Sequence, residues 1–300
     1  MPTVAKVMRK RKPVKKSSVK KGKATTTTRR KKKESVVDRI SSIGFSEDDG
    51  IKLNVYGRSG TGKTTFWATF PKPILAIICS GSTENPGELR SINTPEYRKT
   101  VKQIAIREPH EVAEIVEHQR QEGAYKTIVM DHITGFQDLV LKDVLEIDEL
   151  PEQGSWGMAK QQEWGQCSLQ TKEYLRKLLD LDCNVVLVGQ ERDFNSERDG
   201  DEIIMPFVAS ALTPSTVGWV NHACDYICQT FIRQKCVEKK VKVGKRSVTK
   251  RVPVKGVEYC LRVAPDPVYT SKFRVPKGTV YPEAIVNPTF GDIQKLMNGG

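Results

Sequence analysis

The sequence predicts an α/β fold in which a mostly parallel central sheet is flanked by helices, with antiparallel C-terminal hairpins and a disordered basic N-terminal tail. Two observations support this fold class. Short apolar, β-branched runs alternate with helix-patterned segments from residue 51 to about 188. From 226 to 263 the pattern becomes strand after strand, with alternating valines and lysines broken at Gly244 and Gly256, which predicts antiparallel hairpins.

The charge of the chain is concentrated in its first 34 residues. The 300 residues carry +13 in total, but residues 1–34 hold 15 lysines and arginines against one acid, Glu34, so the other 266 residues sum to −1. Such a segment buries too little apolar surface to offset the entropy cost of ordering. We expect residues 1–35 to be a disordered tail and residues 36–50 a linker. The tail could neutralise nucleic-acid phosphates, or serve only as a solubility tail or nuclear address.

Two classes of protein are disfavoured by composition. No apolar stretch reaches the roughly 18 to 20 residues that cross a bilayer, and the N-terminus lacks the apolar centre of a secretory signal. We therefore expect no membrane association. The seven cysteines are widely spread and none lies in a CxxC pair, which predicts reduced, mostly buried thiols rather than a zinc site.

The expected strands and helices follow in order along the chain. Apolar residues at consecutive positions predict strands covered on both faces, over 52–56, 73–79, 101–106, 125–131 and 184–190. Helical spacing predicts helices over 63–69, 111–122, 136–145 and about 158–181, and a last helix that begins near Asp292. The segment 191–214 is rich in charge and poor in periodicity, and predicts a mobile loop.

A phosphate-binding motif follows the first expected strand. Residues 57–64 read GRSGTGKT, a full match to GxxxxGK[ST] placed between a strand and a helix. Glycines let the backbone N–H groups wrap around phosphate, and the helix N-terminus adds its positive end. Lys63 is expected to reach the β and γ phosphates, and the Thr64 hydroxyl to ligate Mg²⁺. The motif therefore predicts an ATP site, against the alternative of an ordinary glycine-rich turn, with contacts from Gly57, Arg58, Ser59, Gly60, Thr61, Gly62, Lys63, Thr64 and Thr65.

Three further positions complete the expected catalytic site. Asp131 ends the strand TIVMD and is expected to bind the metal, although it could also cap the helix that follows. Gln190, at the tip of the 184–190 strand, could sense the γ-phosphate or simply end the strand. The general base could be Glu84 or Glu88, in the segment after the second strand, and either could equally be a surface acid.

A basic segment in the C-terminal half predicts contact with nucleic acid. Residues 233–255 hold ten lysines and arginines, one acid and interleaved valines, as expected for a ribbon with a basic face. An edge hairpin kept soluble by lysine is the alternative. The residues expected to contact DNA are Lys239, Lys240, Lys242, Lys245, Arg246, Lys250 and Arg251, within a hairpin over 233–256.

The order of these motifs resembles a known family. The P-loop, YKTIVMDHIT, a long helix, a strand ending in VGQ, a hairpin region and SKFRVPKG resemble the phage-type RecA-like ATPases of the single-strand-annealing or recombination group, which carry an AAA-type nucleotide-binding domain. The resemblance implies a RecA-like P-loop NTPase domain over 51–298 that hydrolyses ATP with Mg²⁺. It also implies a cytoplasmic location, in a bacterial host cell if the protein is phage-encoded. The nucleus is the alternative in a eukaryote because of the basic tail.

The resemblance also implies an assembly. In related ring ATPases a K-x-K or K-x-R pair reaches the nucleotide of the adjacent subunit, and Lys272 and Arg274 match that pattern. They could instead be solvated loop charges. One departure affects the base: many relatives place an acid directly after the second strand, where this chain has Cys79, Ser80 and Gly81.

The sequence therefore favours a Mg-ATP-dependent ATPase that acts in DNA recombination or single-strand annealing. It would bind single-stranded DNA through tail and hairpin and form a homo-oligomer, either a ring or a filament, with shared ATP sites. Two alternatives stay open. One is a P-loop small-molecule or nucleotide kinase, and the other is a non-catalytic DNA-binding or packaging protein in which ATP only orders an oligomer.

Overall fold

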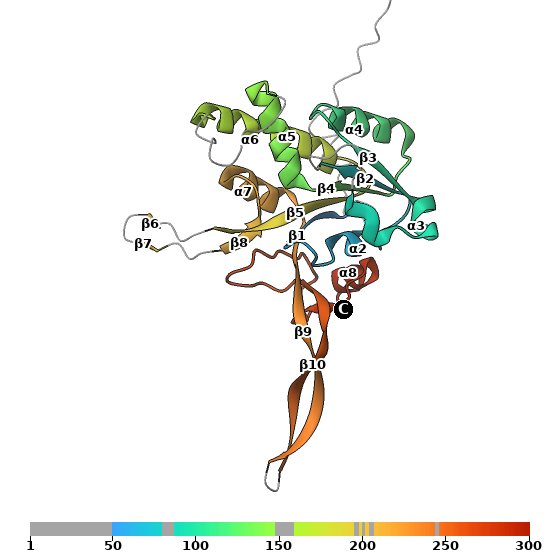
Figure 1. The fold of residues 1–300 in the computed structure, drawn as a ribbon, viewed down its shortest axis with the longest axis vertical. Coiled ribbons are helices and arrows are strands. Elements are labelled where there is room, and N and C mark those ends of the chain that lie inside the picture. The colour runs from blue at the N-terminus through green and yellow to red at the C-terminus, as the bar shows by residue number, and fades with distance from the viewer. Residues whose placement is uncertain are drawn as a thin grey trace, which may run out of the picture. The chain divides into compact units, whose positions relative to one another are not determined.

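The computed structural model describes residues 50–79, 87–147, 159–194, 198–199, 202–203, 207–243 and 246–300. A nine-stranded sheet organises them, in the order β11-β10-β9-β1-β5-β4-β2-β3, with β8 paired to the far end of β5 (Figure 1). The strands are β1 (Lys52–Gly57), β2 (Ile74–Ile78), β3 (Val101–Ala105), β4 (Thr127–Asp131), β5 (Asn184–Phe194), β8 (Phe207–Ser210), β9 (Tyr226–Val243), β10 (Arg246–Arg262) and β11 (Ile285–Val286). A separate pair joins β6 (Arg198–Asp199) to β7 (Glu202–Ile203).

The direction of the strands confirms the predicted fold class. Strands β1 to β5 are parallel to one another, and β9 joins the same sheet parallel to β1. The C-terminal strands β10 and β11 are antiparallel, as is β8 beside β5. The molecule therefore has a mostly parallel sheet with an antiparallel C-terminal edge.

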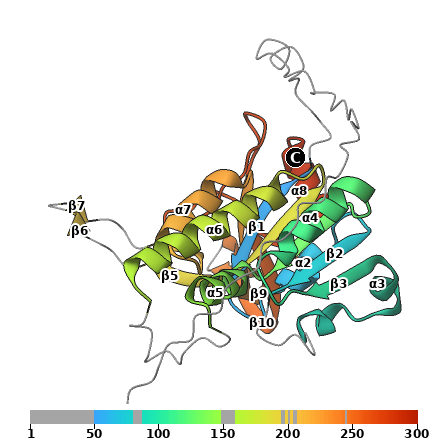
Figure 2. The same cartoon turned by 90° about the horizontal axis from the view of Figure 1, so that it is seen from above.

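Helices cover both faces of the parallel sheet. Helices α4 (Glu111–Glu122), α5 (Ile133–Leu145), α6 (Gln161–Leu179) and α7 (Pro214–Ala223) pack on one face, as Figure 2 shows, while α2 (Lys63–Trp67), the 3-10 helix η1 (Gly87–Ile92) and α8 (Phe290–Met297) pack on the other. Ile128 and Met130 of β4 point to the first face and Val129 to the second. Since both faces are covered, nearly every residue of the central strands is apolar, which explains the continuous runs in the sequence. The prediction of two covered faces is wrong for β3, an edge strand whose middle residues, from Lys102 to Ile104, are exposed.

Local chemistry defines where several helices begin and end. Helix α4 ends at Gly123, whose φ of 58° is left-handed. Helix α5 begins after His132, whose Nδ1 accepts a hydrogen bond from the N–H of Gly135 at 2.9 Å. The cap of α5 is therefore His132 rather than the preceding Asp131. Helix α8 starts with a capping box between Thr289 and Asp292.

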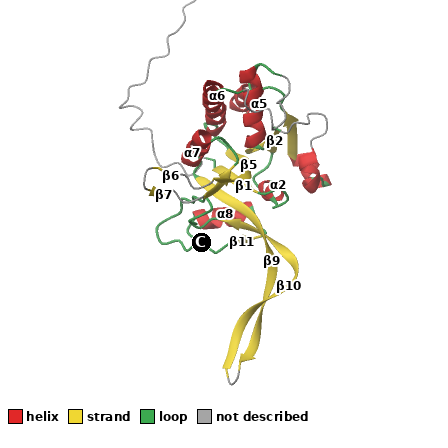
Figure 3. Cartoon of the chain, turned by 60° about the vertical axis from the view of Figure 1, so that its left-hand side comes forward, coloured by secondary structure: helices red, strands yellow, loops and turns green. Residues whose placement is uncertain are grey.

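The C-terminal half differs from the predicted pattern. One long hairpin, β9–β10, replaces several short ones, and its distal part leaves the sheet as a two-stranded ribbon (Figure 3). Gly256 lies within β10 at a register shift between Pro253 and Val257, so it marks a β-bulge and not a turn. The strand therefore continues across this glycine without a chain reversal.

Several more elements were not expected. The predicted mobile loop over 191–214 is wrong at both ends, because β5 continues to Phe194 and β8 pairs with it. Helix α7 follows immediately after, and α3 (Pro95–Thr100) precedes β3. The predicted tail and linker, residues 1–49, lie outside the described residues. Among the helices that are described, none is long and apolar enough to cross a membrane.

Candidate nucleotide site

The phosphate loop joins β1 to α2 at the carboxyl edge of the sheet. Gly60 and Gly62 adopt φ values of 79° and 90°, a left-handed conformation that side chains with a Cβ rarely adopt. Lys63 is the first residue of α2. The loop lines a cavity of about 760 Å³, within the range of about 300 to 1,000 Å³ typical of small-molecule sites.

The cavity brings together the three sequence motifs that predict the site. Asp131 at the end of β4 and Gln190 on β5 both line it, together with the phosphate loop. Their meeting follows from strand order, since β5 lies between β1 and β4, and Gln190 pairs in register with Gly57. Of the motif residues, Ser59, Gly60, Thr61, Gly62, Lys63, Thr64 and Thr65 line the cavity.

Lys63 is held by the loop that it belongs to. Its Nζ donates to the carbonyl oxygens of Gly57 at 2.6 Å and Arg58 at 2.8 Å, and the residue is only 8% exposed. Burial lowers the pKa of Lys63, while the charges of Asp131 and Glu191 act in the opposite direction. A cation in this position suits an anionic ligand that supplies several oxygens at once.

Asp131 has the surroundings of an oriented metal ligand. The residue is 5% exposed, and the indole Nε1 of Trp67 donates to its Oδ2 at 3.2 Å. Carboxylate and hydroxyl oxygens are ligands that Mg²⁺ accepts, and Asp131 and Thr64 supply one of each to the cavity. The residues present therefore fit a magnesium ion with a bound triphosphate, and the outer donor Trp67 orients the acid.

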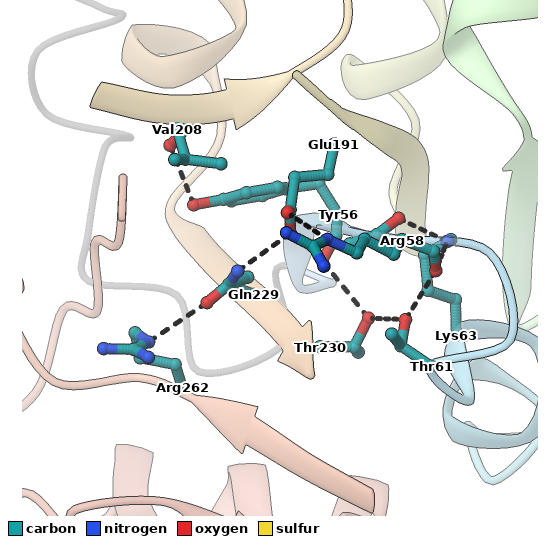
Figure 4. Close-up of polar contacts among 10 residues, drawn as sticks. Tyr56, Arg58, Thr61, Lys63, Glu191, Val208, Gln229, Thr230 and Arg262 are labelled. Carbon is teal, nitrogen blue, oxygen red and sulfur yellow. Dashed lines mark hydrogen bonds and ion pairs between the residues drawn. The ribbon is translucent and has the colours of Figure 1, made fainter. Parts of the chain in front are cut away.

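Glu191 is a site residue that the sequence analysis missed. Its carboxylate, 8% exposed, lies 3.1 Å from Nε of Arg58 in the phosphate loop and accepts a hydrogen bond from Gln229 of β9 at 2.8 Å (Figure 4). Gln229 in turn accepts from Nε of Arg262 at 3.1 Å. The chemical signal was present, since Glu191 follows Gln190, but its partner Gln229 is supplied only by the added strand β9.

Other cavity residues were also missed. Tyr259 of β10 lies over Gly62, where an added Cβ would come within 3.3 Å of its ring. Ser91 of η1 and the segment Asn287, Pro288 and Thr289 before α8 complete the wall. No motif in the sequence marks these residues, because they reach the site only through the packing of the C-terminal half.

The two candidates for the general base are not placed at the site. Glu84 lies outside the described residues. Glu88 lies in η1, three residues before the cavity residue Ser91. The structure describes the backbone of Glu88 but not its side chain. The assignment of either glutamate as the base stays a prediction.

Lys272 and Arg274 are not among the residues that line this cavity. Nζ of Lys272 donates to the carbonyls of Asn221, His222 and Cys224, around the end of α7. Arg274 pairs with Asp225 at 2.6 Å. Asp225 directly precedes β9, which runs parallel to β1 and pairs with it from Leu53 onward. Both cations therefore lie near the amino ends of these strands, whereas the phosphate loop follows the carboxyl end of β1. Their action on a neighbouring subunit stays a prediction.

The predicted DNA-binding residues lie in the distal part of β9–β10. Lys239 is exposed. For five of the others the structure describes the strand backbone but not the side chains: Lys240, Lys242, Arg246, Lys250 and Arg251. Lys245 lies outside the described residues.

Fold and site together define a P-loop nucleotide-binding protein, with a phosphate loop, a strand-end acid and an intervening strand that ends beside the phosphates. Residues 49–275 match the family model described as AAA domain, and the chain belongs to this family. The mostly parallel sheet and the phosphate loop agree with this family assignment.

Comparison with solved structures finds distant likenesses. The flagellar accessory protein FlaH from Methanocaldococcus jannaschii is 10% identical, with a TM-score of 0.40 over 79% of this chain and 86% of FlaH. The KaiC-like protein PH0186 from Pyrococcus horikoshii OT3 is 13% identical, with a TM-score of 0.36 over 72% of this chain and 90% of that protein. No curated protein matches the sequence.

Proposed function

We propose that the protein is a Mg²⁺-dependent ATPase that acts on single-stranded DNA in recombination or strand annealing. The observation that carries the ATPase part is the convergence of Lys63, Thr64, Asp131 and Gln190 on one cavity. Lys63 would grip the β and γ phosphates, and its charge would stabilise the oxygens on which negative charge develops. Thr64 and Asp131 would hold the magnesium ion, which supplies charge neutralisation at the same oxygens. Gln190 would orient water or sense the γ-phosphate.

Phosphate release from Mg-ATP tests the ATPase part. Trp67→Phe is expected to lower the rate roughly 10- to 100-fold because it loosens the orientation of Asp131, and Asp131→Asn, which removes the charge of the metal ligand itself, to lower it further. Free phosphate as the product supports an ATPase, whereas transfer of the γ-phosphate to an added acceptor would indicate a kinase instead. If the wild-type protein binds ATP but releases no phosphate, the proposal of a nucleotide-binding site stands and the proposal of catalysis is wrong.

The basic ribbon supports the DNA part of the proposal. Two paired strands that carry lysines and arginines can follow a phosphate backbone without reading its sequence. The tail over residues 1–34 would add a second set of phosphate contacts. Together they predict affinity that falls steeply with salt and varies little with base sequence.

Salt-dependent binding of a single-stranded oligonucleotide tests that part. Changing Lys239, Lys240 and Lys242 to serine is expected to flatten the slope of log affinity against log salt by about 0.7 for each phosphate that the ribbon no longer neutralises. The matched control changes Lys172, Arg176 and Lys177 of α6, which also removes three cations. Equal effects of both triplets, or binding that ignores salt, would contradict a specific role of the ribbon.

A further inference from the structure

The root of the β9–β10 hairpin touches the phosphate loop at three successive places. Oγ1 of Thr230 on β9 lies 2.7 Å from Oγ1 of Thr61 in the loop. Tyr259 on β10 lies over Gly62. The third contact passes through Glu191, which joins Arg58 of the loop to Gln229 of β9 (Figure 4). The root of the hairpin therefore contacts the phosphate loop from both of its strands, and Tyr259 of β10 also lines the nucleotide cavity.

The contact through Glu191 differs from the other two because it carries charge. The carboxylate is 8% exposed, while the Arg58 side chain is 80% exposed. A buried carboxylate depends strongly on its few partners, whereas an exposed guanidinium can turn to another anion at little cost. Triphosphate oxygens beside the loop would compete with Glu191 for Arg58 and would also repel the carboxylate.

Lys63 adds a second reason for movement at the same place. Its ammonium donates to the carbonyl oxygens of Gly57 and Arg58, and it must leave them to grip phosphate. Gly57 is in close contact with Thr230, and Arg58 is the partner of Glu191. The two loop residues that would lose a hydrogen bond on nucleotide binding thus include one neighbour of β9 and the partner of Glu191.

We propose that Glu191 is a positioning residue that transmits nucleotide binding from Arg58 to Gln229 and so to the hairpin. The proposal rests on the proposed function, since it names how the ATP site and the ribbon regulate each other. By thermodynamic linkage the coupling is reciprocal, so a nucleic acid on the ribbon changes nucleotide affinity by the same factor as nucleotide changes nucleic-acid affinity.

A natural cysteine allows the transmission to be measured directly. Of the seven cysteines, all within the described part of the chain, Cys236 is exposed and the other six are buried. Cys236 lies on β9 six residues beyond Thr230, about 20 Å along the strand from the loop. An environment-sensitive fluorophore on this thiol reports the hairpin, and a separate titration with a fluorescent ATP analogue reports nucleotide binding.

Saturating Mg-ATP is expected to change the fluorescence at Cys236 in the wild-type protein. Glu191→Gln should reduce the amplitude at least threefold while the titration still shows bound nucleotide, because the amide cannot hold the guanidinium by charge. Arg58→Gln, at an exposed position that does not threaten folding, should reduce it similarly. The matched control is Asp193→Asn, an exposed acid two residues further along the same strand, which should keep the full amplitude.

The outcomes separate this inference from the proposed function. No nucleotide binding in the titration would overturn both. Binding without a fluorescence change in the wild type, or full amplitude in both Glu191→Gln and Arg58→Gln, would overturn the inference and leave the ATP site intact. The affinity for a thymidine oligonucleotide, measured with and without ATP, should change by the same factor as the affinity for ATP measured with and without the oligonucleotide. In Glu191→Gln this change should be absent.

Discussion

Burial disfavours the charged form of Lys63 and of Asp138, and the two residues respond to it in different ways. The ammonium of Lys63 is buried against neutral carbonyl oxygens, and burial lowers its pKa. Burial likewise raises the pKa of Asp138 on α5, to about 6, although Lys142 acts in the opposite direction. Lys63 lines the nucleotide cavity, where an anionic ligand would stabilise its charge. Asp138 does not line this cavity.

Lys63→Met is expected to separate the two roles of that lysine. Without nucleotide the variant should be as stable as the wild type or more so, because a buried charge with a desolvation cost is replaced by an apolar chain of similar length. Wild-type protein should gain about 2.7 kcal/mol at a ligand concentration of 100 Kd, and the variant should gain none. Thermal melts with and without Mg-ATP check this, and an equal shift in both proteins would contradict it.

Asp138→Asn is expected to stabilise the protein in a pH-dependent way. The folded state binds the proton more tightly than the unfolded state, so wild-type stability falls as pH rises from about 4 through about 6. The amide does not titrate, and its advantage should grow over that window to the order of 2 kcal/mol and then level off. Urea denaturation at pH 5 and pH 8 measures the difference. Cys167, which senses the charge of Asp138, stays protonated throughout because burial raises its pKa to about 11.

At the scale of elements, α8 links the end of the chain to the nucleotide site. Phe290 at its start packs on Phe70, with ring centroids 4.7 Å apart, and its N–H donates to Oγ1 of Thr69 at 2.8 Å. Thr289, the cap of α8, lines the cavity. The last helix therefore stabilises the segment that follows the phosphate loop.

Thr289→Ala is expected to lower the free energy of unfolding by about 1 kcal/mol, because it removes the side-chain acceptor of the capping box. Thr289→Ser keeps the hydroxyl and should stay within a few tenths of a kcal/mol of the wild type. Chemical denaturation of the three proteins provides the comparison. Equal losses in the alanine and serine variants would point to the methyl group instead of the cap.

At the scale of the whole molecule, the two predicted halves of the catalytic site lie toward opposite edges of one sheet. Asp131 lines the nucleotide cavity, while Arg274 pairs with Asp225 at the end of α7. Within one chain the two groups do not meet. A shared site would require a second copy that presents its α7 edge to the cavity of the first, as a ring or filament does.

Mixing two inactive variants tests this arrangement. Asp131→Ala and Arg274→Ala subunits should each lack ATPase activity. Their mixture should recover part of it, because some interfaces combine an intact Asp131 with an intact Arg274. Full activity of Arg274→Ala alone would refute the role of the arginine in a neighbouring site.

Much of the parallel half was predictable because its signals are local. The runs around β1, β4 and β5 are apolar at nearly every position, and GRSGTGKT has to bend where its glycines allow. Helix α7 was missed because it is short and contains Gly218 and two β-branched valines, so only packing on α6 and the sheet favours it. Gly256 was misread for a similar reason, since a glycine in a strand can mark a bulge or a turn and only pairing with β9 decides.

The sequence alone determined the fold class, the phosphate loop and the acid that lines the same cavity. Runs of apolar residues and the positions of glycines are local signals, so a short stretch of chain is enough to predict buried strands and a phosphate-binding turn. Tertiary structure decided which distant residues surround the phosphate loop. The addition of β9 beside β1 brings Gln229 and Thr230 to the loop and gives Glu191 its second partner, Gln229. Contacts between residues more than thirty positions apart depend on strand order, which no local pattern encodes.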